Sequence, residues 1–331
     1  MPSYLYDSSF INRFMKIVVL DGYLANPGDL SWTPLEEYGS LTVYDRTAPD
    51  QKVERAKDAD AIFVNKVVID QSVMDALPAL KFIGVMATGY NNIDIPAARS
   101  KGITVCNVPA YSTDAVAQTV FALLLEITNR VGEYSRQVNS GKWAESPDFS
   151  FTLGPILELS GLTIGIYGLG NIGRRVAAIA NAFGMKVTSP TSQAPESLPP
   201  YVRKVTFEEF LASSDVISIN SPLTADNRHI FNREAFARMK PGVIIINTAR
   251  GPLIDENDLA EALRSGRVRA AGLDVLEQEP PRDGSPLIGA PNCFITPHIA
   301  WQSTAARRRL VEICIANLTA FAEGKPVNVV S

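Results

Sequence analysis

The sequence predicts an α/β fold built from two doubly wound parallel-sheet domains. Short β-branched runs alternate with helical stretches along nearly the whole chain, as in proteins whose parallel strands are joined by helices. Several runs, such as residues 243–246, are apolar at consecutive positions, as expected where helices cover both faces of a sheet. At 331 residues the chain is also longer than one typical core, so two domains are expected.

The expected strands form two sets separated by a long helix. The first set is residues 16–20, 41–44, 61–64, 82–86 and 103–108, and the second is 163–167, 186–188, 216–220, 243–247, 270–274 and 293–296. Helical periodicity predicts helices at 112–130, 172–183 and 303–322, with a loop at 139–153. No strand follows the second set, so the last helix is expected to pack on the first. Residues 111–298 then form one domain, inserted into a discontinuous domain of residues 1–110 and 299–331.

Composition and charge favour a protein that binds a small molecule. The formal charge is −4, from 31 basic and 35 acidic residues. The densest basic cluster, Arg307-Arg308-Arg309, lies within a helical pattern, and we interpret it as a solvated helix face with no nucleic-acid partner. No apolar run approaches the roughly 20 residues of a membrane span. Residues 1–14 form a short extension without a signal-peptide pattern, so a cytoplasmic location is expected.

The three cysteines favour a reduced interior. Cys106, Cys293 and Cys314 lie far apart and lack the spacing of metal ligands. We therefore expect structural thiols and no metal site.

The glycine loop Gly168-Leu169-Gly170-Asn171-Ile172-Gly173 is the first motif that indicates a ligand. It follows an apolar strand and opens a helix, the context in which this spacing binds a dinucleotide; an ordinary glycine-rich turn is the alternative. Gly168 permits the tight turn, Gly170 lets the backbone approach a pyrophosphate, and Gly173 lets helix pack on strand. The phosphates are expected at the helix N-terminus, where N–H groups and the macrodipole favour an anion.

The end of the next strand predicts which dinucleotide is bound. An acidic residue there holds the ribose 2′-hydroxyl of NAD and repels a 2′-phosphate. Here the uncharged Thr191 and Ser192 occupy the position, so we predict an NAD(P) site at which NADP(H) is tolerated or preferred. No arginine follows directly, and Arg203 or Lys204 would have to reach the phosphate.

The chain has two histidines, and His298 is the candidate acid/base. It follows the strand at 293–296 and Pro297, and polar residues at strand ends build the sites of α/β proteins. The alternative is a structural histidine whose ring nitrogens are hydrogen-bonded within the protein. His229 lies in a polar stretch and is interpreted as a surface residue.

Arg250 and Glu279 are the candidates beside it. Arg250 directly follows a strand that is apolar along its length, where a charge needs a partner or a ligand. Its guanidinium suits a carboxylate, and a structural salt bridge to Asp255 or Glu256 is the alternative. Glu279 lies past the strand that ends at Asp274, and taken alone such an acid is more often solvated than catalytic.

Four motifs, in this order, resemble those of the D-2-hydroxyacid dehydrogenase family. They are the glycine loop 168–173, Asn247-Thr248-Ala249-Arg250-Gly251, Gly272-Leu273-Asp274-Val275 with Glu279-Pro280, and Pro297-His298-Ile299-Ala300. Residues 87–94, 107–117 and 298–301 further resemble the glycerate dehydrogenase (hydroxypyruvate reductase) branch. The resemblance covers the chain from Met15. It implies a Rossmann-type nucleotide domain inserted into a discontinuous flavodoxin-like substrate domain, and a homodimer; the aromatic loop 143–151 then reaches a neighbouring subunit or forms a local cluster.

The resemblance also implies roles for individual residues. The catalytic set falls on Arg250, Glu279 and His298. The implied cofactor contacts are Gly168, Gly170, Asn171, Ile172, Gly173, Thr191, Ser192, Ser221, Thr248, Ala249 and Asp274. The implied substrate contacts are Lys66, Thr88 and Gly89. Two departures from the family pattern, Asn220 in place of a frequent histidine and Thr191 in place of the ribose-binding acid, both bear on cofactor fit.

By resemblance the protein transfers a hydride between NAD(P)H and C2 of a small 2-keto or D-2-hydroxy acid. Hydroxypyruvate or glyoxylate would be reduced to D-glycerate or glycolate. D-lactate or phosphite chemistry on the same scaffold is one alternative. A nicotinamide-sensing regulatory protein, similar to the corepressors that share this fold, is another.

Overall fold

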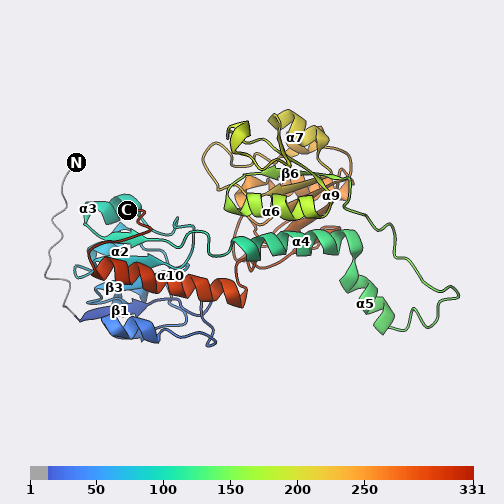
Figure 1. Ribbon diagram of the computed structural model, residues 1–331. Coiled ribbons are helices and arrows are strands. Elements are labelled where there is room, and N and C mark those ends of the chain that lie inside the picture. Colours follow the sequence, from blue (N-terminus) through green and yellow to red (C-terminus); the bar gives the residue numbers. More distant parts are fainter. Residues whose placement is uncertain (1–13) are drawn as a thin grey trace. The chain divides into compact units, whose positions relative to one another are not determined.

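The computed structural model describes residues 14–331 (Figure 1). The chain divides into two compact units, one of Met1–Ser112 with Gln302–Ser331 and the other of Thr113–Trp301. Each unit contains one parallel sheet with helices around it, so the predicted α/β fold is confirmed. The chain crosses between the units after Ser112 and after Trp301. Most of the extension expected at residues 1–14 lies outside the described residues.

The first unit has five parallel strands in the order β2-β1-β3-β4-β5. They are β1 (Met15–Val19), β2 (Gly39–Val43), β3 (Ala61–Val64), β4 (Phe82–Val85) and β5 (Thr104–Cys106). The helices are η2 (Thr33–Tyr38), α1 (Lys52–Arg55), α2 (Gln71–Asp75), α3 (Ile95–Ser100) and α10 (Thr304–Ala322). Helix α10 packs on η2 and β4, so the end of the chain returns to the first set of strands, as the sequence predicts.

The second unit has seven parallel strands in the order β12-β11-β10-β9-β6-β7-β8. They are β6 (Thr163–Tyr167), β7 (Lys186–Ser189), β8 (Val202–Lys204), β9 (Val216–Ile219), β10 (Val243–Asn247), β11 (Val268–Leu273) and β12 (Cys293–Ile295). The helices are α4 (Thr113–Asn129), α5 (Val131–Asn139), α6 (Asn171–Ala182), α7 (Phe207–Ser213), α8 (Arg233–Arg238) and α9 (Glu256–Arg264), with short turns η3 (Pro195–Ser197) and η4 (Gly251–Leu253). In Figure 1, α4 and α6 run side by side along this sheet.

Both faces of the second sheet are buried, which explains its continuous apolar strands. In β10, Val243 and Ile245 pack into one cluster with residues of α7, α8 and α9. Ile244 and Ile246 pack into another with residues of α4 and α6. Because successive side chains of a strand point to opposite faces, a strand buried on both faces must be apolar at every position.

Several elements were not located from the sequence, and two of them show why. Strand β8 was not predicted, because Arg203 and Lys204 make two of its three residues charged and it pairs only at the sheet edge, with β7. Helix α5 lies partly where the helix pattern had ended, and it buries no residue. An element that contributes nothing to a core leaves no apolar period to detect.

The interpretation of Arg307-Arg308-Arg309 as a solvated face is wrong for Arg307. Its side chain is buried, and its guanidinium forms a bidentate pair with Asp29, with both N–O distances 2.6 Å. Hydrogen bonding from Arg307 holds the pKa of the Asp29 carboxyl below its ordinary value. The pair joins α10 to the segment after β1, a contact between residues 278 positions apart that no local pattern predicts.

The remaining composition-based expectations concern thiols, metals and membranes. Cys106, Cys293 and Cys314 are free thiols, and burial raises the pKa of Cys106 and Cys293 to about 12. Across residues 14–331, no three His, Cys, Asp or Glu side chains gather as metal ligands would. Within the same residues, no helix has the length and apolar character needed to cross a bilayer.

Gly173→Ala tests the packing of α6 on β6. A Cβ at Gly173 would lie 2.0 Å from the carbonyl oxygen of Gly168, a backbone atom that cannot rotate away. We expect the free energy of unfolding to fall by at least about 1–3 kcal/mol, the usual cost of overpacking, against a helix-propensity gain of about 1 kcal/mol. Chemical denaturation measures it. Gly170→Ala is the matched control, because a Cβ there meets nothing within 4 Å; equal stability of the two variants would contradict the packing argument.

Candidate active site

The predicted catalytic residues lie on loops that leave one edge of the second sheet. Because all seven strands are parallel, their carboxyl ends share that edge. Arg250 follows β10, Glu279 lies beyond β11, and His298 follows β12. These three strands are neighbours in the sheet, so the fold brings the three loops together although the sequence separates them by 48 positions (250 to 298).

His298 and Glu279 form a hydrogen-bonded pair. The Nδ1 of His298 lies 2.6 Å from Oε2 of Glu279, and both side chains are partly exposed. The other carboxylate oxygen of Glu279 accepts from the N–H of Leu276 at 3.0 Å, which fixes the carboxylate plane. With Nδ1 engaged, Nε2 is the ring nitrogen left to exchange a proton with a ligand.

The buried carboxylate of Asp274 shapes the loop that carries His298. It accepts hydrogen bonds from the hydroxyl of Thr296 (2.6 Å) and from the N–H groups of Ile299 (2.9 Å) and Ala300 (2.8 Å). Between them His298 adopts φ +55°, a left-handed conformation that costs a non-glycine residue energy. Burial raises the pKa of Asp274, and these hydrogen bonds oppose that rise. In this structure the predicted cofactor contact Asp274 therefore supports the His298 loop.

Arg250 lies in a turn held by Asn247, the last residue of β10. The buried Asn247 side chain accepts from the N–H of Ala249 (2.9 Å) and donates to the carbonyl of Arg250 (3.0 Å). The guanidinium of Arg250 donates to the Ala249 carbonyl, at 2.6 Å. Within residues 14–331 it forms no ion pair, and its proposed structural partners are otherwise engaged: Asp255 caps α9, and Glu256 bonds elsewhere. The salt-bridge alternative is thereby excluded for the described part of the chain.

Glu256 is a supporting residue that the motif analysis missed. It is 8% exposed, and its carboxylate accepts from the N–H of Glu277 (2.7 Å) and the hydroxyl of Ser285 (2.6 Å). It thus holds the loop that carries Glu279 against α9. A Cβ at Gly251 would lie 1.9 Å from the carbonyl oxygen of Leu276, so this loop also packs against the backbone beside Arg250. The sequence gives no signal for Glu256 beyond its place after the helix cap.

His229 is not a free surface residue. Its Nε2 lies 3.1 Å from Oε1 of Glu277, and Arg228 pairs with the same carboxylate. The cluster fixes the outer part of the loop between Leu276 and Glu279. The interpretation as a surface loop residue needs that correction, although the side chain is still one-third exposed.

The surroundings of the three motif glycines differ. Gly168 has φ +93°, and a Cβ there would lie 2.5 Å from the N–H nitrogen of Ser221. Gly173 is required by the packing described above. Gly170, by contrast, has φ −81° and open space around its Cβ position. The fold itself therefore does not require glycine at 170, and the space beside it is open.

Other predicted cofactor contacts surround this opening. Asn171 and Ile172 begin α6, whose N-terminus has no side-chain cap. Two buried polar atoms at neighbouring strand ends, Oγ1 of Thr248 and Oδ1 of Asn220, have no hydrogen-bond partner in the described residues. Unpartnered buried polar atoms are rare in proteins and indicate a site for a polar ligand. The residues present therefore fit a bound dinucleotide.

The loop after β7 contains the predicted ribose-binding residues. The hydroxyl of Thr191 accepts from the N–H of Gln193 at 3.2 Å, and Ser192 is exposed. The two basic residues considered from the sequence behave differently. Arg203 pairs with Glu209, whereas Nζ of Lys204 donates to the carbonyl of Gln193 at 2.8 Å.

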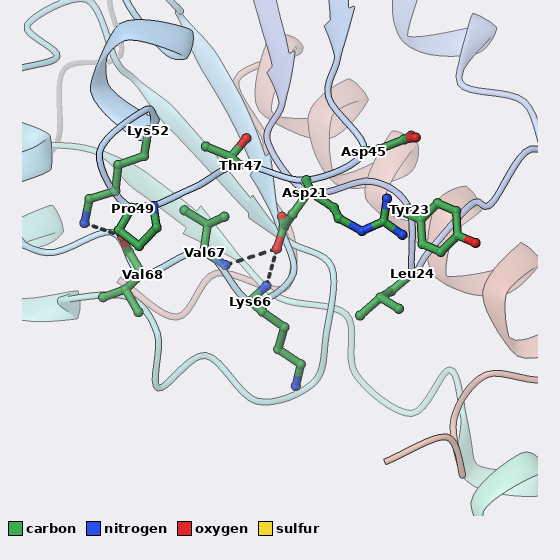
Figure 2. Close-up of a pocket in the computed structure, with 11 residues that line it drawn as sticks. Asp21, Tyr23, Leu24, Asp45, Thr47, Pro49, Lys52, Lys66, Val67 and Val68 are labelled. Atoms are coloured by element: carbon green, nitrogen blue, oxygen red, sulfur yellow. Dashed lines mark hydrogen bonds between the residues drawn. The ribbon is translucent and has the colours of Figure 1, made fainter. Parts of the chain in front are cut away.

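The predicted substrate contacts lie in the first unit, on the loops after β3 and β4. Thr88 donates to the carbonyl of Val108 at 2.8 Å, and Gly89 follows it in an irregular stretch. Lys66 follows β3, and its backbone N–H donates to the carboxylate of Asp21 at 2.5 Å, while its side chain extends away (Figure 2). Burial raises the pKa of Asp21.

Lys66 also lines a pocket of about 510 Å³ at the carboxyl ends of β1, β2 and β3 (Figure 2). The lining includes Asp21, Tyr23, Thr47, Lys52 and Val68. Strand connections leave β1 in opposite directions here, and ligands of open α/β sheets bind at such points. None of Arg250, Glu279 and His298 lines this pocket.

Comparison with known proteins places this geometry in a family. Residues 121–300 match the model described as "D-isomer specific 2-hydroxyacid dehydrogenase, NAD binding domain". A hydroxypyruvate reductase of Blautia hydrogenotrophica is 47% identical over 96% of this chain and 100% of its own length. A glycerate dehydrogenase of Methylorubrum extorquens is 39% identical over 85% and 88% of the two chains.

A solved structure agrees with these relatives. An acyclic imino acid reductase (Bsp5), in complex with NADPH and D-Arg, superposes with a TM-score of 0.83 and 33% identity, covering 96% of this chain and 100% of its own. The glycine loop, the strand order and full-length similarity thus lead to one conclusion: the chain belongs to the D-isomer-specific 2-hydroxyacid dehydrogenase family.

Proposed function

We propose that the protein reduces hydroxypyruvate or glyoxylate with a nicotinamide dinucleotide, giving D-glycerate or glycolate, and that it accepts NADP(H). The observation that carries the reaction type is the 2.6 Å His298–Glu279 pair, set on the same sheet edge as an arginine without an ionic partner in the described residues. The relatives named hydroxypyruvate reductase and glycerate dehydrogenase support the substrate class.

Each residue of this set has a distinct task. A nicotinamide cofactor, when bound, would supply the hydride for substrate C2, and the chain's own residues would do the rest. The guanidinium of Arg250 binds the carboxylate and polarises the keto oxygen. Nε2 of protonated His298 delivers the proton to the developing alkoxide. The Glu279 carboxylate contacts Nδ1 of His298, which orients the ring and leaves Nε2 directed away from the pair.

The cofactor would lie in the open space at Gly170. It would bind the uncapped N-terminus of α6 and the Thr248 hydroxyl, which has no partner in the described residues. Helix N-termini bind pyrophosphate through N–H groups that have no partner within the helix. Lys66, Thr88 and Gly89 stay predicted substrate contacts. A homodimer and a cytoplasmic location likewise stay predictions.

A matrix of substrates and cofactors tests the proposal. Initial rates are measured with hydroxypyruvate, glyoxylate and pyruvate, each with NADH and with NADPH at equal concentration. We expect turnover of the first two substrates, with NADPH at least as effective as NADH. No turnover with any 2-keto acid would overturn the enzymatic role in favour of a sensor of nicotinamide, and rates far higher with NADH would overturn the cofactor assignment.

Gly170→Ala tests the cofactor cradle. The methyl group meets no protein atom within 4 Å, so stability should change by less than about 1 kcal/mol. Binding of both NADH and NADPH should weaken by roughly tenfold or more, because the methyl group fills space needed by the pyrophosphate. Fluorescence titration gives the affinities and thermal unfolding gives the control. Unchanged affinities would show that no ligand approaches the backbone here.

Glu279→Gln tests the acid/base pair through turnover. The amide keeps the shape of the side chain but removes the carboxylate that contacts Nδ1 of His298 at 2.6 Å, so kcat of reduction should fall. The loss should be smaller than the roughly 10²–10⁴-fold expected for His298→Ala. Glu277→Gln is the matched control, since Glu277 contacts Arg228 and His229 instead, and it should keep the parent kcat. If Glu279→Gln also kept the parent kcat, Glu279 would have no part in the proton transfer.

A further inference from the structure

The ends of β7 and β8 bring together three residues that have no role in the reaction proposed above. The two strands are parallel neighbours, with Ser189 in register with Lys204. The loop after β7 carries Gln193, and Lys204 is the last residue of β8. Arg174 lies in the first turn of α6, directly after the glycine loop. Three separate segments therefore meet beside the place where the ribose of a dinucleotide is recognised.

Gln193 joins these segments through hydrogen bonds. Its Nε2 donates to the carbonyl of Leu169 in the glycine loop, at 2.9 Å. Its Oε1 accepts from the guanidinium of Arg174. Its backbone carbonyl accepts from Nζ of Lys204, at 2.8 Å. One neutral residue thus fixes the loop to the glycine motif and holds two cations, Arg174 through its side chain and Lys204 through its backbone carbonyl.

No carboxylate in the described part of the chain neutralises the charges of the two cations. Besides Gln193, Arg174 donates to the carbonyl of Ser197, with both distances 3.2 Å. Neither Arg174 nor Lys204 pairs with a carboxylate within residues 14–331. The acid nearest in sequence to Gln193, Glu196, is exposed and bonds neither cation in that part of the chain. The adjacent Arg203, in contrast, is paired with Glu209.

We propose that Arg174 and Lys204, positioned by Gln193, bind the 2′-phosphate of NADP(H) and set the cofactor preference of this protein. A phosphate carries close to two negative charges and three strong acceptor oxygens, so it gains from an arginine fork and an ammonium group together. NAD has only a hydroxyl at this position and gains little from either cation. This pair of cations, which we call the clamp, rests on the proposed use of NADP(H). It assigns recognition of the 2′-phosphate to residues outside the loop positions Thr191 and Ser192.

Three variants separate this clamp from general support of the loop. Lys204→Met and Arg174→Met remove one cation each and keep most of the apolar stem. Gln193→Glu keeps the side-chain shape and places a carboxylate against the Arg174 guanidinium, which neutralises that cation and repels the phosphate. Arg203→Met is the matched control, because this neighbouring cation is engaged by Glu209. Thermal unfolding identifies any variant that fails to fold.

Binding is measured by calorimetry with NADPH, NADH, 2′,5′-ADP and 5′-AMP. We expect each of the three variants to weaken NADPH and 2′,5′-ADP by roughly ten- to a hundredfold, the scale of a lost charge-assisted hydrogen bond. NADH and 5′-AMP should change by less than about threefold, and Arg203→Met should change none of the four. The preference for NADPH should also decrease as salt concentration rises.

The outcomes distinguish the clamp from the proposed function. Equal weakening of NADPH and NADH would assign the residues to loop structure and overturn the clamp, as would unchanged affinity for 2′,5′-ADP. An unaltered protein that bound 2′,5′-ADP no better than 5′-AMP would overturn the use of NADP(H), and the clamp with it. Selective loss of NADPH in a protein without turnover of any 2-keto acid would support the clamp while overturning the proposed reaction.

Discussion

The hydrogen bonds accepted by Asp274 determine the geometry on which the candidate site depends. Its carboxylate is 1% exposed, and burying a charge is costly unless hydrogen bonds compensate. Three donors do so, and two of them are the consecutive N–H groups that follow His298. That arrangement turns the chain sharply and holds His298 at φ +55°. Without it the histidine would relax to an ordinary conformation and its ring would no longer meet Glu279.

The loop that carries Glu279 is held in a similar way, by a second buried acid. Glu256 at the start of α9 accepts from the N–H of Glu277, and the close approach of Gly251 to Leu276 fixes the other side. The chain thus uses carboxylates for two different purposes. Asp274 and Glu256 bind backbone N–H groups and fix loops, while Glu279 binds a ring nitrogen. Of the three, Glu279 is the one that contacts a ring with a second nitrogen, and it is also the most exposed.

Much of the fold could be predicted from the sequence, because a strand buried on both faces is apolar at consecutive positions. Strand β10 is the clearest case, and its predicted and observed bounds coincide. The sequence does not predict strand β8, because this edge strand has two charged residues and therefore no continuous apolar run. Helix α5 was missed for the same reason. At these two elements the prediction failed because burial, which is the quantity that hydrophobic patterns encode, is small or absent.

The candidate site likewise contains residues that the sequence identifies and residues that it does not. Motifs placed Arg250, Glu279 and His298, because each follows a recognisable strand, and they placed the glycine loop. They did not identify Glu256, Gln193 or Arg174, whose roles depend on contacts 19 to 29 positions away in the chain. The pairing of Arg307 with Asp29 was out of reach for the same reason. A residue that acts through a distant partner has no local signature.

Charge compensation gives a further way to interpret the basic residues. Arg267, for example, has no carboxylate partner in the described residues, but its three bonds go to carbonyls at the end of α8, where the helix dipole is negative. Backbone structure therefore explains its place. Arg174 also bonds the carbonyl of Ser197 at the end of the three-residue turn η3, but Lys204 reaches no helix end, and both converge on one neutral residue at the carboxyl edge of a parallel sheet. Within the described residues neither cation has an ionic partner, so the charge there is unbalanced. An anionic ligand restores that balance, which is why the position of these two charges, rather than their number, carries the argument for a phosphate.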